Sequence, residues 1–324
     1  MAGTAKGYNA AWEDAAKLVA SKNFRGLRIS CPKCRRQGTV FSKWIKGVSI
    51  KPLFVCHYNG NGHFRACELS EDYAASARRK IGIDRGDVIK SLRMGKAIIL
   101  FSGGKDSLCL LHYLNKLAQS IGREIVALHV NTTAGFPEVE SYVEEVCHYL
   151  NIPLTTVRPT HDYFELAKRW GIPGVKSRWC CETLKIVPIR RFIASLNGPK
   201  IVFDGIRAVE SSIRATYVPI WFHPSFRSIS VSPIFGWSDE KIMKYISKHD
   251  LPKSPASNLK GSSECWCGAY KNRSDFEKLL GVHPDIFDKL VDVENAQKGK
   301  YTFLFEDGVR IPLASLKVEK KSNK

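Results

Sequence analysis

The chain has 324 residues, of which 44% are hydrophobic and 25% are charged. These values are typical of a globular protein and exclude the disordered and fibrous classes. The 50 Lys and Arg residues outnumber the 31 Asp and Glu residues, and the net charge of +19 favours a polyanionic partner. A basic surface that serves solubility alone is the plainer alternative.

Residues 1–95 are the most basic part of the chain, with 18 Lys and Arg against 7 Asp and Glu, and they contain four of the ten cysteines. A Cys-x-x-Cys pair followed at a distance by further Cys or His residues has the spacing of a zinc site. The candidate ligands are Cys31, Cys34, Cys56 and Cys67, with His57 or His63 as alternatives to Cys56. Aromatic and basic residues between them fit a small β ribbon that folds around Zn²⁺. Unliganded buried cysteines are the alternative.

The first residues do not have the pattern of a secretory signal, because Lys6, Glu13 and Asp14 interrupt any apolar run. The apolar run AIILF is far too short to cross a bilayer. We therefore expect a cytoplasmic protein without a membrane partner. Thiols stay reduced there, so clustered cysteines are expected to bind metal or to take part in chemistry.

From residue 96 onward, short apolar runs alternate with segments of helical spacing. This alternation predicts an α/β fold with a doubly wound parallel sheet. The expected strands are 96–101, 124–130, 152–159, 200–206 and 228–235, and the expected helices are 106–122, 136–151, 162–172, 182–197 and 238–250. The expected domains are a zinc-ribbon-like domain at 1–75, a linker helix at 76–95, a nucleotide-binding domain at 96–250, and a cysteine-containing loop with a helical extension and basic tail at 251–324.

The segment Ser-Gly-Gly-Lys-Asp-Ser at 102–107 lies between a buried strand and a helix, where open α/β sheets bind ligands. Two glycines permit a sharp turn, and the start of a helix attracts anions. Lys105 can offset phosphate charge, and Asp106 can hold Mg²⁺. The segment is not a Walker A loop, which requires a different spacing. An ordinary glycine-rich turn is the alternative.

This segment resembles the PP-loop of the adenine-nucleotide α-hydrolase superfamily. NTTAGFPEVE, SRWCCETLK, DGIRAVESSIR, SPIFGWSDEKIMKYI and ECWCGAY, in that order, resemble the phosphoadenosine phosphosulfate (PAPS) reductase-like branch. The resemblance covers residues 96 to about 275. It implies a PP-loop (HUP-type) fold, ATP binding and cleavage between the α and β phosphates.

The resemblance also implies roles for single residues. Those expected to bind the nucleotide are Ser102, Gly103, Gly104, Lys105, Asp106, Ser107, Val130, Asn131, Thr132, Gly205, Arg207 and Arg214. By this resemblance, residues 130–132 would lie near the adenosine, and Gly205, Arg207 and Arg214 would form a second anion-binding wall. Arginine suits such a wall, because its planar fork binds phosphate bidentately. The family commonly has Asp-Thr where this chain has Asn131-Thr132, so a metal role at that position is in doubt. Lys185 is expected near the same pocket.

The second cysteine group consists of Cys180, Cys181, Cys265 and Cys267. Iron-containing members of the family hold a 4Fe–4S cluster with a Cys-Cys pair and a later Cys-x-x-Cys, whereas this chain has Cys-x-Cys. A catalytic dithiol without a cluster is the alternative. Two further cysteines, Cys109 and Cys147, have apolar neighbours in helical patterns and are expected to be packing residues.

Two enzymatic functions follow from the resemblance. In the first, Mg²⁺-ATP adenylylates RNA (tRNA) for sulfur transfer, with the basic N-terminal domain on the RNA backbone, and a sulfur-donor protein is a possible further partner. In the second, the protein reduces PAPS or adenylyl sulfate to sulfite. We favour the first, because SGGKDS is complete and residues 268–324 contain no cysteine to act as the reductase nucleophile. A non-enzymatic nucleic-acid-binding module is a third possibility.

Overall fold

The computed structural model describes residues 83–322 except 175–176, 212–213, 215–216, 224 and 256–264, and the backbone of four earlier strands. Those strands are β1 (Arg28–Ser30), β2 (Gln37–Ser42), β3 (Leu53–Tyr58) and β4 (Phe64–Ala66). They pair antiparallel in the order β1-β2-β3-β4. The side chains of the six candidate zinc ligands lie outside the described part of the chain, so the zinc site stays a prediction.

The central sheet has six strands in the order β7-β6-β5-β8-β10-β9. They are β5 (Lys96–Leu100), β6 (Ile125–Val130), β7 (Leu154–Val157), β8 (Lys200–Phe203), β9 (Ile220–His223) and β10 (Ser228–Val231). The pairs β6/β7, β5/β8 and β8/β10 are parallel, and β9 is antiparallel to β10. The predicted α/β class with a mostly parallel sheet is confirmed, and all five expected strands are present. The edge strand β9 was not expected.

The helices agree with the predicted alternation. They are α3 (Arg85–Met94), α4 (Lys105–Ser120), α5 (Pro137–Tyr149), α6 (Tyr163–Trp170), α7 (Val187–Ser195), α8 (Asp239–Lys248), α9 (Arg273–Val282), α10 (Pro284–Ala296) and α11 (Leu313–Ser322). A π-helical segment, η1 (Cys181–Ile186), leads directly into α7, and a 3₁₀ turn, η2 (Ala208–Glu210), follows β8. Within the described residues, no helix is both long and apolar enough to cross a membrane.

The chain divides into two compact units. The first contains β5, β8, β9, β10 and α8, with most of α4, and the second contains β6, β7, α5 to α7 and the C-terminal helices. Each unit has a core of aliphatic residues that are almost fully buried. Cys109 on α4 and Cys147 on α5 are buried in this way, which confirms that both are packing residues.

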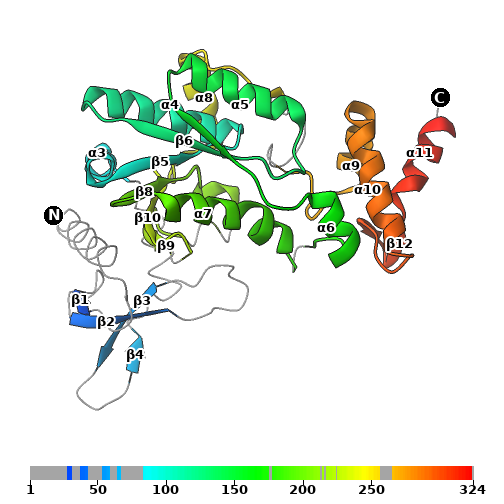
Figure 1. Cartoon of the computed structure of the whole chain (residues 1–324), viewed down its shortest axis with the longest axis horizontal. Helices are drawn as coiled ribbons and strands as arrows, with labels where there is room; N and C mark the ends of the chain where they lie inside the picture. The colour runs from blue at the N-terminus through cyan, green and yellow to red at the C-terminus, as the bar shows by residue number, and fades with distance from the viewer. Residues whose placement is uncertain are drawn as a thin grey trace. The chain divides into compact units, whose positions relative to one another are not determined.

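A helical extension forms the C-terminal part of the second unit, where α10 packs against α6, α9 and α11 (Figure 1). A short hairpin of β11 (Leu304–Glu306) and β12 (Val309–Ile311) precedes α11. The carboxylate of Glu294 on α10 accepts hydrogen bonds from the backbone N–H groups of Phe303 and Leu313, both at 2.7 Å. One buried carboxylate thus fixes both ends of the hairpin segment.

In the first unit, Asp204 directly follows β8 and is buried. Its Oδ1 accepts hydrogen bonds from the Ser232 hydroxyl at 2.6 Å and from the Ile206 N–H at 3.2 Å. Burial raises the pKa of Asp204 to about 6, although these hydrogen bonds oppose the shift. The folded state therefore disfavours the ionised carboxylate, and stability falls as the pH rises from about 4 through about 6.

We predict that Asp204→Asn stabilises the protein at pH 8 relative to the wild type, by up to about 3 kcal/mol. The asparagine oxygen keeps both hydrogen bonds but carries no charge, so the advantage should disappear at pH 4. Denaturant unfolding at the two pH values measures the effect. Asp292→Asn, at an exposed position on α10, serves as the control and should change little. If Asp204→Asn changes the free energy of unfolding equally at both pH values, Asp204 does not carry a destabilising buried charge at pH 8.

Candidate active site

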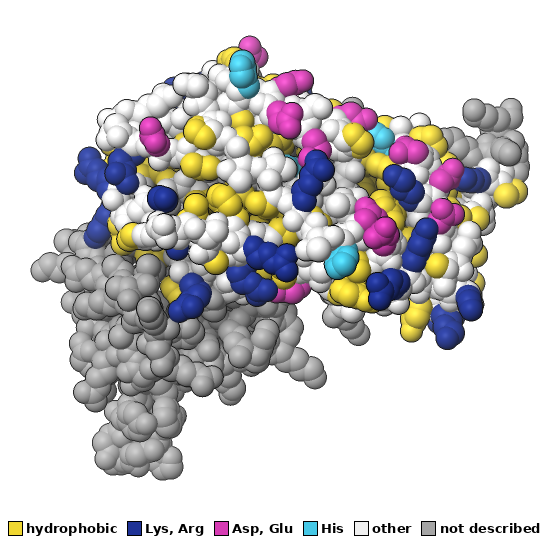
Figure 2. All heavy atoms as spheres, viewed as in Figure 1, with side chains coloured by type: hydrophobic (Ala, Val, Ile, Leu, Met, Phe, Trp, Pro, Cys, Tyr) yellow, Lys and Arg dark blue, Asp and Glu magenta, His cyan; other side chains and the backbone are white. Residues whose placement is uncertain are grey.

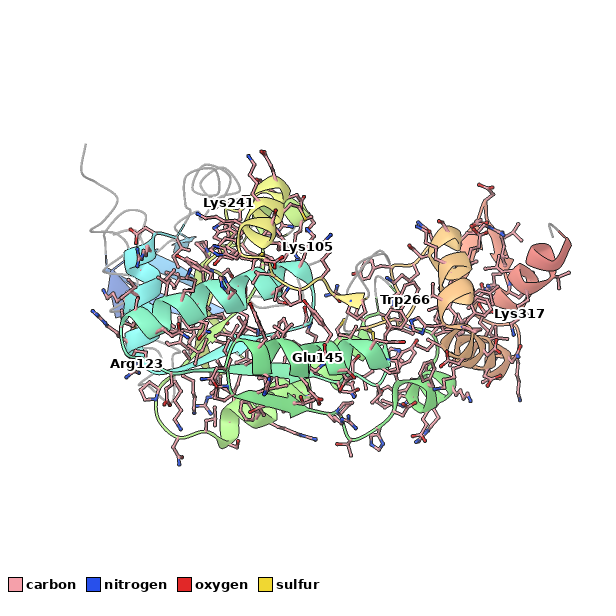
Figure 3. The ribbon with its side chains drawn as sticks, turned by 90° about the horizontal axis from the view of Figure 1, so that it is seen from above. Lys105, Arg123, Glu145, Lys241, Trp266 and Lys317 are labelled. Carbon is pink, nitrogen blue, oxygen red and sulfur yellow. The ribbon has the colours of Figure 1, made fainter. Side chains whose placement is uncertain are left out.

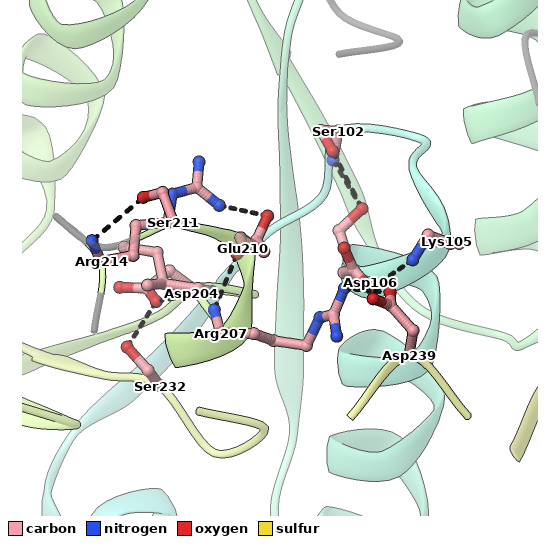
Figure 4. Close-up of polar contacts among 12 residues, drawn as sticks. Ser102, Lys105, Asp106, Asp204, Arg207, Glu210, Ser211, Arg214, Ser232 and Asp239 are labelled. Carbon is pink, nitrogen blue, oxygen red and sulfur yellow. Dashed lines mark hydrogen bonds and ion pairs between the residues drawn. The ribbon is translucent and has the colours of Figure 1, made fainter. Parts of the chain in front are cut away.

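The PP-loop is held in shape by its own two serines (Figure 4). The Ser102 N–H donates to the Ser107 hydroxyl at 3.2 Å, and that hydroxyl donates to the Gly104 carbonyl at 2.9 Å. The two hydroxyl oxygens lie 3.0 Å apart. Ser107 belongs to the first turn of α4 and is buried. The serines therefore close the loop over the start of the helix, where N–H groups lack intrahelical partners.

Gly103 lies at the tightest point of the loop. Its φ angle is +75°, a left-handed conformation in which residues with a Cβ are strained. A Cβ at this position would lie 2.9 Å from Val139 Cγ1 and 3.3 Å from Val143 Cγ2, both on α5. The glycine is thus required for the turn and for the close packing of the loop on α5.

Two charged side chains stand at the start of α4. Lys105 Nζ lies 3.6 Å from Asp106 Oδ1. Lys105 is 47% exposed and Asp106 is 20% exposed (Figure 4). A cation and a carboxylate beside a helix start are the groups that bind phosphate oxygens and Mg²⁺.

A buried histidine, which the sequence did not indicate, supports the entry to the loop. His129 on β6 is 2% exposed, and its Nδ1 donates to the carbonyl of Phe101 at 2.8 Å. Its Nε2 lies 3.2 Å from Glu140 Oε1 on α5. Burial raises the pKa of Glu140, but the hydrogen bond and charge of His129, with Asn131 and Arg158, outweigh burial and hold this pKa below its usual range. The pair ties β6 and α5 to the residue before Ser102.

The residues after β6 form a turn that is fixed by its own side chains. Asn131 N–H donates to the Val157 carbonyl at 3.0 Å, and Asn131 Oδ1 accepts from the Thr133 N–H at 2.9 Å. Thr133 has a φ of +63°, and its hydroxyl accepts the N–H of Tyr163 at the start of α6 at 2.7 Å. Val130 and Thr132, two of the predicted adenosine neighbours, are buried in this turn.

The predicted second anion wall lies in the first unit. Arg207 is only 3% exposed at its side chain, donates to the Trp237 carbonyl at 3.1 Å and pairs with Asp239 Oδ1 at 2.8 Å. Arg214 pairs with Glu210, whose other oxygen accepts the Arg207 N–H at 2.8 Å. Acidic residues therefore position both arginines (Figure 4). Their contact with a nucleotide stays a prediction, as does that of Gly205.

The four cysteines of the second group come together in the second unit, although 84 positions separate Cys181 from Cys265. The side chains of Cys180 and Cys181, of Cys180 and Cys267, and of Cys265 and Cys267 interact with each other. The contact of the Cys-Cys pair with the Cys-x-Cys pair is therefore a feature of the structure.

The four thiols differ in acidity. Hydrogen bonds from Cys180 and Cys265 lower the pKa of Cys267 to about 3. The hydrogen bond from Cys180, together with Arg178 and Lys185, lowers the pKa of Cys181 to about 7. The same hydrogen bonds, with burial, raise the pKa of Cys180 and Cys265. Cys267 and Cys181 are thus the more acidic of the four thiols, and the thiolate is the form that binds metals.

Aromatic side chains pack next to the cysteine segments. The Trp266 N–H donates to the Ala134 carbonyl at 2.5 Å, and its indole is buried against Phe136 at a centroid distance of 5.5 Å. Figure 3 shows Trp266 between α5 and the C-terminal helices. The Tyr163 hydroxyl donates to the Cys267 carbonyl at 2.8 Å, and Trp179 stacks on the Tyr163 ring. These aromatic contacts were not predicted from the sequence.

The chemistry of the donor set fits an iron–sulfur cluster, since four thiolates bind the four irons of a 4Fe–4S centre. Among the described residues, no three or more His, Cys, Asp or Glu side chains are arranged to hold one metal ion. By composition, the four thiols fit such a cluster, and a dithiol remains the alternative.

We predict that Gly103→Ala destabilises the protein by about 1–3 kcal/mol more than Gly122→Ala. Both glycines have positive φ angles, +75° and +62°, so both variants carry similar backbone strain. A Cβ at Gly122 meets nothing within 4 Å, whereas one at Gly103 meets the buried Val139. Denaturant unfolding measures the free energy of unfolding that each variant loses. Equal losses would show that the loop does not depend on its packing against α5.

This chain is similar to several known proteins. An uncharacterized protein of Methanocaldococcus jannaschii is 30% identical over 209 residues, which are 62% of this chain and 42% of that protein. This chain thus spans less than half of that relative. An adenosine 5'-phosphosulfate reductase of Bacillus cereus is 27% identical over 168 residues, which are 51% of this chain and 69% of the reductase.

Two solved structures are similar at a low level. PAPS reductase from Candida auris has a TM-score of 0.43 and 18% identity, over 60% of this chain and 95% of that one. A U34-tRNA thiolase from Methanococcus maripaludis, with its 4Fe-4S cluster, has a TM-score of 0.40 and 18% identity, over 75% and 84%. The phosphoadenosine phosphosulfate reductase domain matches residues 96–257, which is half of the chain. This chain therefore belongs to the phosphoadenosine phosphosulfate reductase domain family.

Proposed function

We propose that the protein is an ATP pyrophosphatase that adenylylates a nucleic-acid substrate, with RNA as the first candidate, for sulfur transfer. The observation that carries this proposal is the complete Ser-Gly-Gly-Lys-Asp-Ser loop, closed by its serines over the start of α4. A phosphosulfate reductase does not need to cleave a triphosphate. A complete loop therefore favours a reaction that does.

In the proposed reaction, the α4 N-terminus, Lys105 and the two serines bind the β and γ phosphates of ATP, and Asp106 holds Mg²⁺. A carbonyl oxygen of the substrate attacks the α-phosphorus, the bond to the bridging oxygen breaks, and pyrophosphate leaves. A sulfur nucleophile of the hydrosulfide class then attacks the activated carbon, and AMP leaves with the substrate oxygen. The cationic groups stabilise the charge that develops on the phosphates.

The cysteine group is proposed to serve the sulfur step. A bound iron–sulfur cluster would supply a soft site for sulfur and electrons. The residues that would hold it are Cys180, Cys181, Cys265 and Cys267. Arg178 and Lys185 lower the pKa of Cys181 and so favour an anionic group there. Zn²⁺ at the N-terminal cysteines and a sulfur-donor protein as partner belong to the same proposal.

A second candidate function is the reduction of a sulfonucleotide to sulfite. Curated relatives of this chain from several Bacillus strains are adenosine 5'-phosphosulfate reductases. A thiolate of the cysteine group would then attack the sulfur of the substrate, the sulfur–oxygen bond would break and the nucleotide would leave. A thiol reductant would release sulfite from the resulting cysteine thiosulfonate. Sulfite production from adenylyl sulfate or PAPS with a thiol reductant, and no pyrophosphate release from ATP, would establish this function instead.

We predict that Lys105→Ala lowers the rate of pyrophosphate release from ATP by at least about 10-fold, because the cation stabilises the departing pyrophosphate. The control is Lys116→Ala, which removes an exposed lysine of the same helix and should leave the rate unchanged. The assay measures pyrophosphate with and without bulk tRNA. No release from the wild type under either condition would overturn the adenylylation proposal.

We predict that anaerobically purified protein contains iron and absorbs near about 400 nm. Cys180→Ser and Cys267→Ser should lose both signals, because each removes a thiolate ligand. Cys109→Ala, which removes a buried packing cysteine, should keep them. Iron analysis and the visible spectrum measure the outcome. A wild type that lacks iron and absorbance would support the dithiol alternative.

A further inference from the structure

A small pocket lies beside the cysteine group in the second unit. Three segments contribute to its lining, residues 172–174, then Gly268, Ala269 and Lys271, and residues 301–303, and its volume is about 190 Å³. Pockets for drug-sized ligands range from about 300 to 1,000 Å³, so this one has room for a single ring or a group of similar size. Cys267 directly precedes one of its walls.

The pocket depends on a glycine that follows the Cys-x-Cys pair. Gly268 has a φ of +80°, and a Cβ there would lie 2.3 Å from the ring of Phe303. Only glycine allows Phe303 to pack against this turn. The carboxylate of Glu294 accepts the Phe303 N–H and so fixes the opposite wall. The walls are therefore specified by buried contacts of the unit.

One large exposed aromatic side chain lines the pocket, and two more belong to its wall segments or precede them in the chain. Tyr301 lines it and is 58% exposed. Tyr270, within the wall segment 268–271, is 58% exposed, and Trp170, two residues before the wall segment 172–174, is 53% exposed. The Trp170 ring meets the edge of Trp179, next to Cys180, at a centroid distance of 5.3 Å. Exposed rings of this size leave apolar area in water that a ligand can cover.

Cationic groups accompany these rings. Arg178 donates to the Tyr270 hydroxyl at 2.7 Å and lies 5.6 Å from the centre of its ring. Lys271, a lining residue, lies 4.0 Å from the centre of the Trp266 ring. Lys168 and Arg169 are exposed in the last turn of α6, directly before Trp170. On the face shown in Figure 2, lysine and arginine side chains are scattered among acidic and apolar ones. Arg178 and Lys271 therefore place cationic groups next to aromatic rings of this part of the unit.

Rings for stacking and cations for phosphates are the two components of single-strand nucleic-acid sites. A small anion would need the cations but not the three exposed rings. We propose that the pocket and the rim of Trp170, Tyr270 and Tyr301 bind an unpaired nucleobase of a single-stranded nucleic acid beside the cysteines. The substrate class, a nucleic acid, is taken from the proposed function. The inference adds the place on the protein where that substrate binds.

The test compares two ligands of equal charge, a uridine oligonucleotide and an abasic sugar-phosphate strand of the same length. The full chain binds both in fluorescence anisotropy, and charge contacts anywhere in the protein affect both strands alike. Trp170→Ala and Tyr301→Ala should weaken binding of the base-containing strand by about 5- to 100-fold and leave the abasic strand unchanged. The control is Tyr149→Ala, which removes an exposed tyrosine at the end of α5.

Several outcomes would overturn the inference. One is that the variants lose the same affinity for both strands, and another is that they lose affinity for neither. A third is that thiosulfate displaces the strand while Trp170→Ala has no effect on its binding. Melting temperatures of the variants identify a loss that comes from unfolding, and Trp170→Phe should then restore base-dependent binding. A deoxyuridine strand of the same length tests the role of the sugar. Tighter binding of the uridine strand shows that the protein contacts the 2′-hydroxyl, and equal binding of the two strands supports recognition of the base.

The binding assay needs neither ATP nor iron, so it separates this inference from the proposed function. Base-dependent binding without pyrophosphate release would support the nucleobase site and contradict the adenylylation proposal. Pyrophosphate release without base-dependent binding would retain adenylylation and reject the site.

Discussion

One buried side chain, the indole of Trp266, anchors the Cys-x-Cys segment of the second unit. Its backbone N–H bonds to Ala134, its ring packs on Phe136, and it is 1% exposed. A tryptophan buried to this extent contributes several kcal/mol, more than any one hydrogen bond near it. Since Cys265 and Cys267 flank this residue, burying its ring also determines where both thiols lie. The cysteine group is therefore positioned by apolar packing and not by the thiols themselves.

Helix α5 connects this packing to the nucleotide loop. Phe136 is the residue before α5, and Val139 and Val143 of that helix lie against Gly103. His129 and Glu140 add a hydrogen-bonded connection from α5 and β6 to the residue before Ser102. One helix thus supports the phosphate loop and contacts the cysteine segment within a single unit. An enzyme that first activates a substrate with ATP and then transfers sulfur needs both groups on one rigid support.

Much of the fold was predictable, because apolar periodicity and the Gly-Gly turn are local signals. The five strands, the helices that alternate with them, and the packing roles of Cys109 and Cys147 followed from such signals. The contact between Cys180 and Cys267 was expected only from a family resemblance, since spacing cannot show which segments meet in space. His129 was missed because a histidine in an apolar strand has no signature, and its two hydrogen bonds are visible only in the structure. The rim of Trp170, Tyr270 and Tyr301 draws on three distant segments and has no sequence pattern at all.

In the proposed reaction ATP activates an oxygen of the substrate, and the fate of that oxygen can be measured. The reaction with nucleic acid and a sulfide donor is run in ¹⁸O-labelled water, and the AMP product is analysed by mass spectrometry. Our account predicts AMP without the heavy isotope, because the oxygen that leaves with AMP comes from the substrate. AMP that carries ¹⁸O would show that water attacked the α-phosphorus, and it would contradict the account.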